Sequence, residues 1–129
     1  RHVLIVNAED GLDEISIAAP TTVAELKDGK ITEYSITPEQ FNLNRASLDD
    51  IKAADADASL NIINAVFSGK KDGKLEAAAN IIALNAGAAI YVSGKTESLE
   101  QGIELAQSVI ANGEAKSKFS QLIDLSQKL

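Results

Sequence analysis

The segment "TTVAELKDGKITEYSIT", residues 21–37, carries the clearest fold signal in this sequence of 129 residues. Two β-prone runs flank Asp28-Gly29, a pair that favours tight type I′ hairpin turns because both central residues of such a turn need positive φ. The pattern predicts antiparallel strands near residues 22–27 and 30–36. A hairpin is therefore the best-defined part of the predicted β-structure.

The sequence before the hairpin also predicts extended structure. "HVLIV", residues 2–6, is a continuous apolar run that predicts a strand buried on both faces, as in a parallel sheet. "ISIAAP", residues 15–20, is predicted to be extended and to end at its proline. A strand buried on both faces needs more partners than one hairpin supplies. Because the chain also enters this strand directly after Arg1, with no methionine, we expect part of a sheet to lie upstream.

From Ser47 onward the sequence predicts four or five helices. "SLDD" at this point resembles a capping box, which begins a helix by pairing the free backbone N–H groups of its first turn. The following segment is expected to place Leu60, Ile63 and Phe67 on one face. Gly69 is expected to end that helix.

"KLEAAANIIALNAGAAIYVSG", residues 74–94, is apolar nearly all the way round, which is typical of a helix buried between neighbours. The small residues 86–89 are expected to let another backbone come close. The apolar part, residues 77–92, is predicted to be too short to span a bilayer. Asn80 and Asn85 interrupt it, and because buried amides must be hydrogen-bonded, we expect a structural role such as tying this helix to a loop.

Two further helices complete the pattern. One is expected to begin at "SLEQ", with Ser98 as its cap, and to end at Gly113. Its apolar residues at helical spacing are Leu99, Ile103, Ala106 and Ile110. The last helix is predicted to be amphipathic, with the apolar residues Phe119, Leu122, Ile123 and Leu129. The predicted fold class is α/β, with few strands, including a β-hairpin, followed by four or five helices.

The composition narrows the range of partners. With 12 Lys and Arg against 19 Asp and Glu, the formal net charge is −7, which argues against nucleic acid or an anionic membrane as a partner. A phosphorylated small molecule stays compatible with this charge, since a metal ion can bridge two anions. There is no cysteine, so disulfides and thiolate metal sites are excluded. "SGKKDGK", residues 68–74, lacks the spacing of a phosphate-binding P-loop and is predicted to be a solvated linker.

The acidic turn "EDGLDEIS", residues 9–16, is the strongest candidate for a functional site. It places four carboxylates within six residues, directly after the first predicted strand. Mg²⁺ prefers oxygen ligands and often takes only one or two carboxylates plus substrate phosphates, which Asp13 and Glu14 would supply. In open α/β sheets ligands gather at the carboxyl ends of strands. Charged turns are also common on protein surfaces, so these residues by themselves leave a cation site and a solvated turn both open.

Three stretches of the chain resemble one enzyme family. "EDGLDEIS", the following pattern P-T-x-V-x-E-L-x-x-G-x-I-x-E-Y, and "IIALNAGAAIYVSGKTESLEQGIELAQSVIANGEA" are similar to the C-terminal part of anthranilate phosphoribosyltransferases. The resemblance runs along essentially the whole chain. It implies that residues 1–129 form the C-terminal part of a nucleoside-phosphorylase/phosphoribosyltransferase-like α/β domain, in a cytoplasmic enzyme of tryptophan biosynthesis.

The resemblance also implies a reaction. Members of the family transfer the phosphoribosyl group of phosphoribosyl pyrophosphate to the amine of anthranilate and release pyrophosphate, which Mg²⁺ chelates. The acidic pair of the family matches Asp13 and Glu14, which are therefore expected to be Mg²⁺ ligands. A metal at the leaving group stabilises the negative charge that builds up there. Glu9 and Asp10 are expected to be loop surface.

Other parts of the family's site have no counterpart in these residues. The resemblance places a glycine-rich "GTGGD" pyrophosphate loop, the anthranilate-contacting residues and a helical N-terminal domain, through which the family dimerises, upstream of Arg1. No catalytic or substrate-binding residue is therefore assigned, and the chain alone is expected to be inactive. The family commonly shows His-Gly where this sequence has Asn7-Ala8, although Gly11 is retained.

Two alternatives belong to other functional classes. One is a pyrimidine nucleoside phosphorylase of similar fold, and the other is a non-catalytic α/β interaction domain whose acidic turn is only solvated. The remaining candidate side chains favour packing roles. His2 is the single histidine and has no evident nucleophile to serve, and Tyr34 and Tyr91 fit hairpin and helix packing.

Overall fold

The computed structural model describes residues 1–128. Its first layer is a three-stranded antiparallel sheet in the order β1 (His2–Ala8), β2 (Thr21–Lys27), β3 (Lys30–Ile36). The register of β2 and β3 leaves only Asp28 and Gly29 in the loop, with φ of 52° and 76°. These positive values are those of a type I′ turn, and the predicted hairpin is confirmed.

Strand β1 differs from its prediction. It pairs antiparallel with β2, and its residues alternate between the two faces of the sheet. Leu4 and Val6 pack against the core, whereas Val3 and Ile5 on the other face are 42% and 67% exposed. The prediction of a parallel-type strand buried on both faces was therefore wrong for this structure. A run of β-branched residues fits any pleated surface, and it does not report whether one face or both are covered.

The segment after β1 is a buried loop and not a strand. Ile15 and Ile17 are 3% and 0% exposed, and both belong to the main hydrophobic core. The backbone around them pairs with no strand within residues 1–128. The alternation in "ISIAAP" therefore marked burial correctly, but the predicted extended run does not join the sheet.

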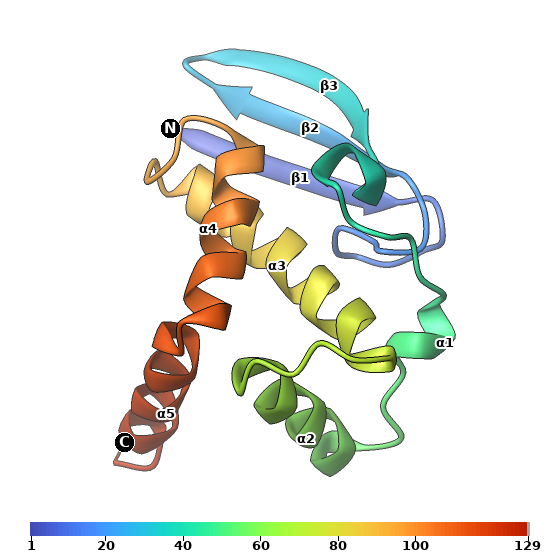
Figure 1. The fold of residues 1–129 in the computed structure, drawn as a ribbon. Coiled ribbons are helices and arrows are strands. Elements are labelled where there is room, and N and C mark those ends of the chain that lie inside the picture. The colour runs from blue at the N-terminus through green and yellow to red at the C-terminus, as the bar shows by residue number, and fades with distance from the viewer. Residues whose placement is uncertain (129) are drawn as a thin grey trace.

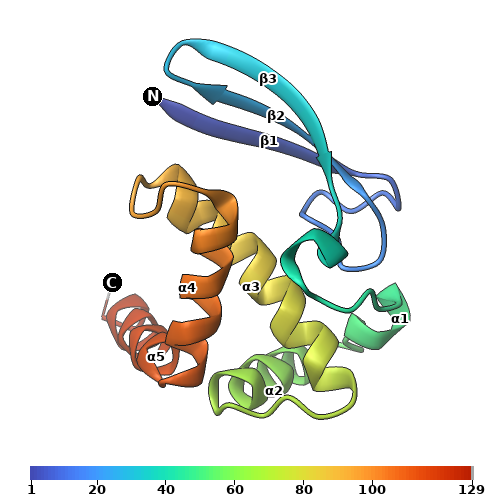
Figure 2. The ribbon, with the colours of Figure 1, turned by 45° about the horizontal axis from the view of Figure 1, so that its top comes forward.

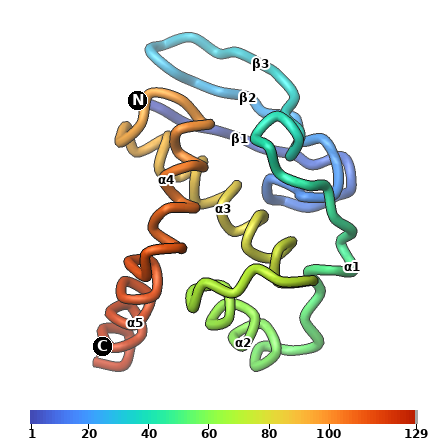
Figure 3. Tube along the Cα trace, in the orientation of Figure 1, coloured from blue at the N-terminus to red at the C-terminus, as the bar shows by residue number. Residues whose placement is uncertain are grey.

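The helices lie on one side of the sheet, with α3 against β1 and with α2 and α5 extending away from the strands, as Figures 1 and 2 show from two directions. After a 3₁₀ turn at Pro38–Phe41 come α1 (Leu48–Ile51), α2 (Ala56–Phe67), α3 (Lys74–Val92), α4 (Leu99–Ala111) and α5 (Glu114–Ser126). The predicted class, few strands and then four or five helices, is confirmed. The tube in Figure 3 shows that the loop after β1 lies at the end of the sheet opposite the N-terminus.

Helix α3 is the central helix of the fold. It contacts β1, α1, α2 and α4. Its buried residues are Ala77, Ala78, Ala79, Ala83, Leu84, Gly87 and Tyr91. By length and composition α3 could cross a membrane, so the prediction that this stretch is too short was wrong. A core helix passes the same test, and here α3 packs under the sheet and against α4 (Figure 1).

The crossing of α3 and α4 depends on two glycines. A Cβ added to Gly87 would lie 2.6 Å from the backbone nitrogen and Cα of Ile103 on α4. A Cβ added to Gly102 would overlap the carbonyl oxygen of Gly87. The predicted close approach at the small residues of α3 is thereby confirmed. Ile103 is almost fully buried beside this crossing.

Helix α4 agrees with the sequence pattern in detail. The N–H of Gln101 donates to the Oγ of Ser98, so Ser98 is the predicted cap. All four predicted core residues of α4 are buried: Leu99, Ile103, Ala106 and Ile110. Asn112 and then Gly113, whose φ is +85°, end the helix where the pattern places its end.

Helices α2 and α5 agree with their predicted faces only in part: Ile63 and Phe67 of the predicted α2 face are partly buried. In α2 the buried residue is Val66, with Phe67 partly buried beside it, whereas Leu60 is 42% exposed. In α5 Phe119 stacks edge-on against Phe67, with ring centroids 5.5 Å apart, but Leu122 is 61% exposed. The predicted position Leu129 lies outside the described residues. Helical spacing located both helices without deciding which face meets the core.

A candidate metal site at the acidic turn

The backbone of the acidic turn, residues 9–16, is held in a definite conformation after β1. The N–H of Glu9 donates to the carbonyl of Pro20 at 3.0 Å, which closes the loop at its two ends. The N–H of Gly11 donates to the carbonyl of Ala8 at 3.1 Å, and Gly11 has a φ of +91°. This left-handed conformation favours glycine and explains the single glycine among the acids.

Asp10 and Ser16 fasten the turn from within. The Oδ1 of Asp10 accepts from the N–H of Leu12 at 3.1 Å, and its Oδ2 accepts from the Ser16 hydroxyl at 2.5 Å. Ser16 is 1% exposed, and its Oγ also accepts from the N–H of Ala18 at 2.9 Å. Asp10 is therefore a half-buried structural acceptor, and its prediction as loop surface was wrong. The same prediction for Glu9 is confirmed, because Glu9 is exposed.

Asn85 fastens the same turn to helix α3. Its Oδ1 accepts from the N–H of Ile15 at 2.9 Å, and its Nδ2 donates to the carbonyl of Ile15 at 3.0 Å. The Nδ2 also donates to the carbonyl of Ile81, one turn earlier in the helix, at 3.1 Å. The predicted role for Asn85, tying this helix to a loop, is confirmed.

Asp13 and Glu14 lie between these two fastenings and face solvent. The ion pairs found within residues 1–128 lie elsewhere, at His2–Glu25, Arg45–Glu39 and Lys52–Asp49. The two carboxylates are therefore available to a ligand. Asp10, by contrast, already has both oxygens hydrogen-bonded.

The donor set suits one kind of metal better than others. Among residues 1–128 there is no group of three or more histidine or acidic side chains placed to hold a metal. A structural zinc site, which takes four protein ligands, therefore does not fit among these residues. Mg²⁺ fits, because it commonly takes one or two carboxylates and completes its shell with water and substrate phosphates.

Glu14 also borders a cavity of about 410 Å³. Most of the lining is apolar and comes from the turn and the helices: Leu12, Ile51, Ala53, Ile62, Ile63, Ala78, Ile81 and Ile82, with Ser59. Among the residues that the structure describes, Glu14 is the one charged residue in this lining, as is usual for small-molecule pockets, which are mostly apolar with a few polar groups. Glu14 thus stands where an apolar surface meets the acidic turn.

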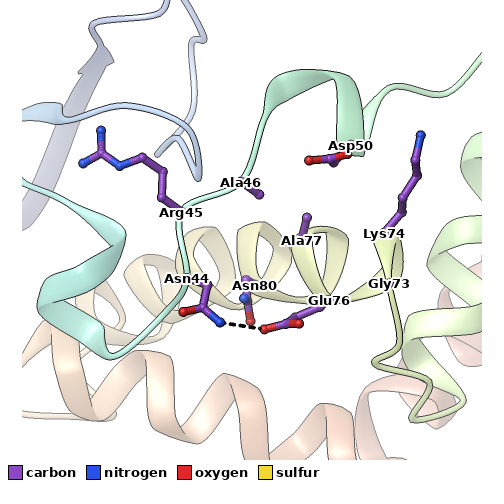
Figure 4. Close-up of a pocket in the computed structure, with 9 residues that line it drawn as sticks. All are labelled: Asn44, Arg45, Ala46, Asp50, Gly73, Lys74, Glu76, Ala77 and Asn80. Atoms are coloured by element: carbon purple, nitrogen blue, oxygen red, sulfur yellow. Dashed lines mark hydrogen bonds between the residues drawn. The ribbon is translucent and has the colours of Figure 1, made fainter.

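A second cavity, of about 370 Å³, lies at the N-terminal end of α3 (Figure 4). Figure 4 shows the hydrogen bond across it, from the Nδ2 of Asn44 to the Oε1 of Glu76, at 3.2 Å. Arg45 lines this cavity but pairs with Glu39 at 2.7 and 3.2 Å, and this pairing lowers the pKa of Glu39 to about 2. The lining also holds Lys74 together with the acids Asp50 and Glu76, so its two cationic and two acidic side chains leave it with no net positive charge.

The sequence did not predict a polar cluster that forms around a buried carboxylate of the sheet, Glu25. Glu25 is 9% exposed and accepts from His2 at 2.7 Å, from the Tyr91 hydroxyl at 2.7 Å and from the Tyr34 hydroxyl at 2.9 Å. Burial by itself raises the pKa of Glu25, but the bonds from Tyr91, His2 and Tyr34 outweigh it, so the pKa lies below its usual value. Lys27 completes the cluster by donating to the Tyr91 hydroxyl at 3.1 Å.

The signal for this cluster was present in the strand pattern. In β2 the buried positions alternate, and Glu25 occupies an inward position in line with Thr21 and Val23. An acid at an inward position must be paired. The predicted packing roles of Tyr34 and Tyr91 are confirmed, and their hydroxyl groups are the partners of that acid.

Comparison with known proteins extends these findings. Residues 1–116 match the family model described as "Glycosyl transferase family, a/b domain". The anthranilate phosphoribosyltransferase of Marinomonas sp. (strain MWYL1) is 55% identical over 122 residues, which are 95% of this chain and 35% of that protein. The chain thus spans about a third of the length of the curated relatives that it matches.

Solved structures give the same result for the fold. The anthranilate phosphoribosyltransferase from Thermus thermophilus has a TM-score of 0.79 at 34% identity, over 93% of this chain and 34% of that one. The enzyme from Saccharomyces cerevisiae in complex with PRPP and Mg has a TM-score of 0.81 at 23% identity, over 98% of this chain and 35% of that one. Because the family model covers nearly the whole sheet-and-helix arrangement, the chain belongs to the glycosyl transferase family and has the fold of its a/b domain.

Proposed function

We propose that the chain is part of an anthranilate phosphoribosyltransferase of tryptophan biosynthesis. The carrying observation is the 55% identity to the Marinomonas enzyme over 95% of the chain. In this reaction the anthranilate nitrogen bonds to the anomeric carbon of phosphoribosyl pyrophosphate, the carbon–oxygen bond to pyrophosphate breaks, and the nitrogen loses a proton. We assign residues 1–129 to the C-terminal part of the α/β domain: the match of residues 1–116 to the a/b domain model supports the domain, and the resemblance to the C-terminal part of the family supports the position.

Asp13 and Glu14 are the residues that we assign to Mg²⁺. Both are exposed at the turn after β1, between backbone segments fastened by Asp10 and by Asn85. Bound Mg²⁺ would neutralise the charge that develops on the departing pyrophosphate. In this proposal, the two carboxylates hold the cation, and phosphate oxygens and water take the remaining coordination positions of the cation.

The remaining parts of the proposal concern partners and location. Anthranilate and phosphoribosyl pyrophosphate are the proposed substrates, and a homodimer formed through a helical N-terminal domain is the proposed assembly, both by analogy with the family. We place the reaction in the cytoplasm, which is supported by a sequence without cysteine that fits a reducing compartment. The net charge of −7 supports a small-molecule substrate over nucleic acid.

Replacing both acids tests the metal assignment. In the full-length gene product, Asp13→Asn with Glu14→Gln is expected to lower kcat/KM for phosphoribosyl pyrophosphate by about 100- to 1000-fold, since transition-state charge stabilisation by a metal is worth several kcal/mol. The apparent Mg²⁺ requirement should rise as well. Consumption of anthranilate and release of pyrophosphate, followed over a Mg²⁺ series, measure both effects.

Glu9→Gln is the matched control for this experiment. It removes a carboxylate from the same exposed turn, outside the assigned pair, and should change kcat/KM by less than about twofold. An unchanged Mg²⁺ dependence in the double variant would favour a merely solvated turn and overturn the assignment. Turnover of a pyrimidine nucleoside with phosphate, in place of anthranilate and phosphoribosyl pyrophosphate, would favour a nucleoside phosphorylase.

A further inference from the structure

We infer that Asn85 of α3 is a positioning residue for the acidic turn, which holds the backbone at Ile15 so that Asp13 and Glu14 are ready to share one cation. The inference rests on the proposed function, because it takes these two acids as the metal ligands. Asn85 itself touches neither the metal nor the substrate in this assignment. It acts through the backbone of the turn.

The geometry at Asn85 is that of a dedicated backbone anchor. The amide pairs with both the N–H and the carbonyl of Ile15, at 2.9 and 3.0 Å, as a neighbouring strand would. Its third bond, to the carbonyl of Ile81 at 3.1 Å, fixes the amide to its own helix. A polar side chain on a central apolar helix is unfavourable unless its hydrogen bonds are made. Two of the three hydrogen bonds of the Asn85 amide are made with the backbone of Ile15.

The anchor at Ile15 is one of two that bracket the acid pair. On the other side of the pair, the N–H of Leu12 donates to Asp10, which is itself held by the buried hydroxyl of Ser16. Asp13 and Glu14 are therefore the two residues between two fixed backbone amides. Ordering a loose turn on metal binding would cost the backbone entropy of both residues. Fixed amides remove much of that cost, and the affinity for the cation rises accordingly.

Metal affinity provides a readout that a purely structural bond would not move. The probe is Mn²⁺ in the presence of inorganic pyrophosphate, with binding to the full-length gene product followed by electron paramagnetic resonance. Asn85→Ala is expected to weaken Mn²⁺ binding about tenfold, the lower end of the effect seen when residues behind a metal's ligands are replaced. The Mg²⁺ concentration for half-maximal activity should rise by a similar factor, with kcat at saturating Mg²⁺ changed much less.

Asn80→Ala is the matched control. Asn80 is an asparagine on the same helix, partly buried like Asn85, but it lines the other cavity and not the acidic turn (Figure 4). This variant should leave Mn²⁺ affinity unchanged. Asn85→Gln is the second variant: it keeps the amide and leaves no cavity, but displaces the hydrogen-bonding groups by one methylene. It should also weaken Mn²⁺ binding, even if Asn85→Ala does not fold.

A double-variant comparison separates the inference from the proposed function. In the Asp13→Asn, Glu14→Gln background, Asn85→Gln should cause no further loss of Mn²⁺ affinity, because its effect passes through these acids. If the acid variant loses Mn²⁺ and Asn85→Gln, tested alone in the native background, binds as tightly as the native protein, the inference is overturned and the metal assignment stands. If the acid variant binds Mn²⁺ like the native protein, both are overturned.

Discussion

Gly102→Ala is expected to lower the free energy of unfolding by about 3 kcal/mol, at the upper end of the effect of overpacking a core. The added methyl would overlap the carbonyl oxygen of Gly87 on α3, which is backbone and has no rotamer to move into. Relief requires α3 and α4 to separate, although Ile103 and Ala106 beside the crossing are almost fully buried. Urea unfolding followed by far-ultraviolet circular dichroism measures the change.

Ser108→Ala is the control for this prediction. It places the same side chain on the exposed face of α4, where it should change the free energy of unfolding by less than about 0.5 kcal/mol. Gly87→Ala should be destabilising as well, since its methyl meets the backbone of Ile103. The two glycine variants share one contact, so combining them should cost less than the sum of their separate effects. A loss below about 1 kcal/mol for Gly102→Ala would contradict the close crossing.

The helix crossing is also connected to the acidic turn. Asn85, which holds Ile15, is two residues before Gly87 on α3. A shift of α3 away from α4 therefore moves the anchor of the turn together with the helix. We expect the Gly102→Ala variant, where it remains folded, to bind Mn²⁺ with pyrophosphate more weakly than the Ser108→Ala control.

Glu25→Leu is expected to lower the free energy of unfolding by about 3 kcal/mol near pH 7, because it leaves the hydrogen-bond partners of a buried carboxylate without an acceptor. These partners are His2 from β1, Tyr34 from β3 and Tyr91 from α3, so one acid joins three elements to β2. Glu25→Gln should be milder, since an amide oxygen still accepts. Thermal and urea unfolding of both variants measure the difference.

The pH dependence of stability gives a second test of the same cluster. The pKa of Glu25 is lower in the folded protein than its usual value, so its contribution is present above the pKa of the unfolded chain, about 4.3, and is lost as the pH falls through the folded pKa. The native protein should therefore lose stability below about pH 4.5, and Glu25→Gln should lose less over that range. Glu33→Gln, on an exposed position of β3, is the control and should follow the native curve.

Tyr34 and Tyr91 are expected to affect the alkaline side of the curve of stability against pH. Burial, followed by the bond to Glu25, raises the pKa of Tyr91 and of Tyr34 in the folded protein. Their contribution is present below the pKa of a free tyrosine, about 10, and is lost as the pH rises above it. Tyr91→Phe should therefore flatten the alkaline limb of the stability curve. If the stability of Tyr91→Phe fell at alkaline pH as steeply as that of the native protein, the proposed contribution of the Tyr91 hydroxyl would be contradicted.

The sequence predicted which residue types form the candidate site, but not which of its acids are structural and which are free to bind a ligand. The pattern "EDGLDEIS" located the turn, and the amide of Asn85 was expected to tie its helix to a loop. That the loop is this turn follows only from a contact between residues 70 positions apart. The pattern also did not separate Asp10, which holds the loop together, from Asp13 and Glu14, which face solvent. All are acids in one turn, and only their partners distinguish them.

The sequence by itself determined the local elements of this protein. Asp28-Gly29 specified the hairpin turn, Ser98 the start of α4, and Gly113 its end, because each acts through φ angles and hydrogen bonds within a few residues. Only the tertiary structure decided which surfaces are covered. The one-sided burial of β1, the inward acid Glu25 with its partners from three elements, and the packing of α3 against α4 depend on groups distant in sequence, which no local pattern encodes.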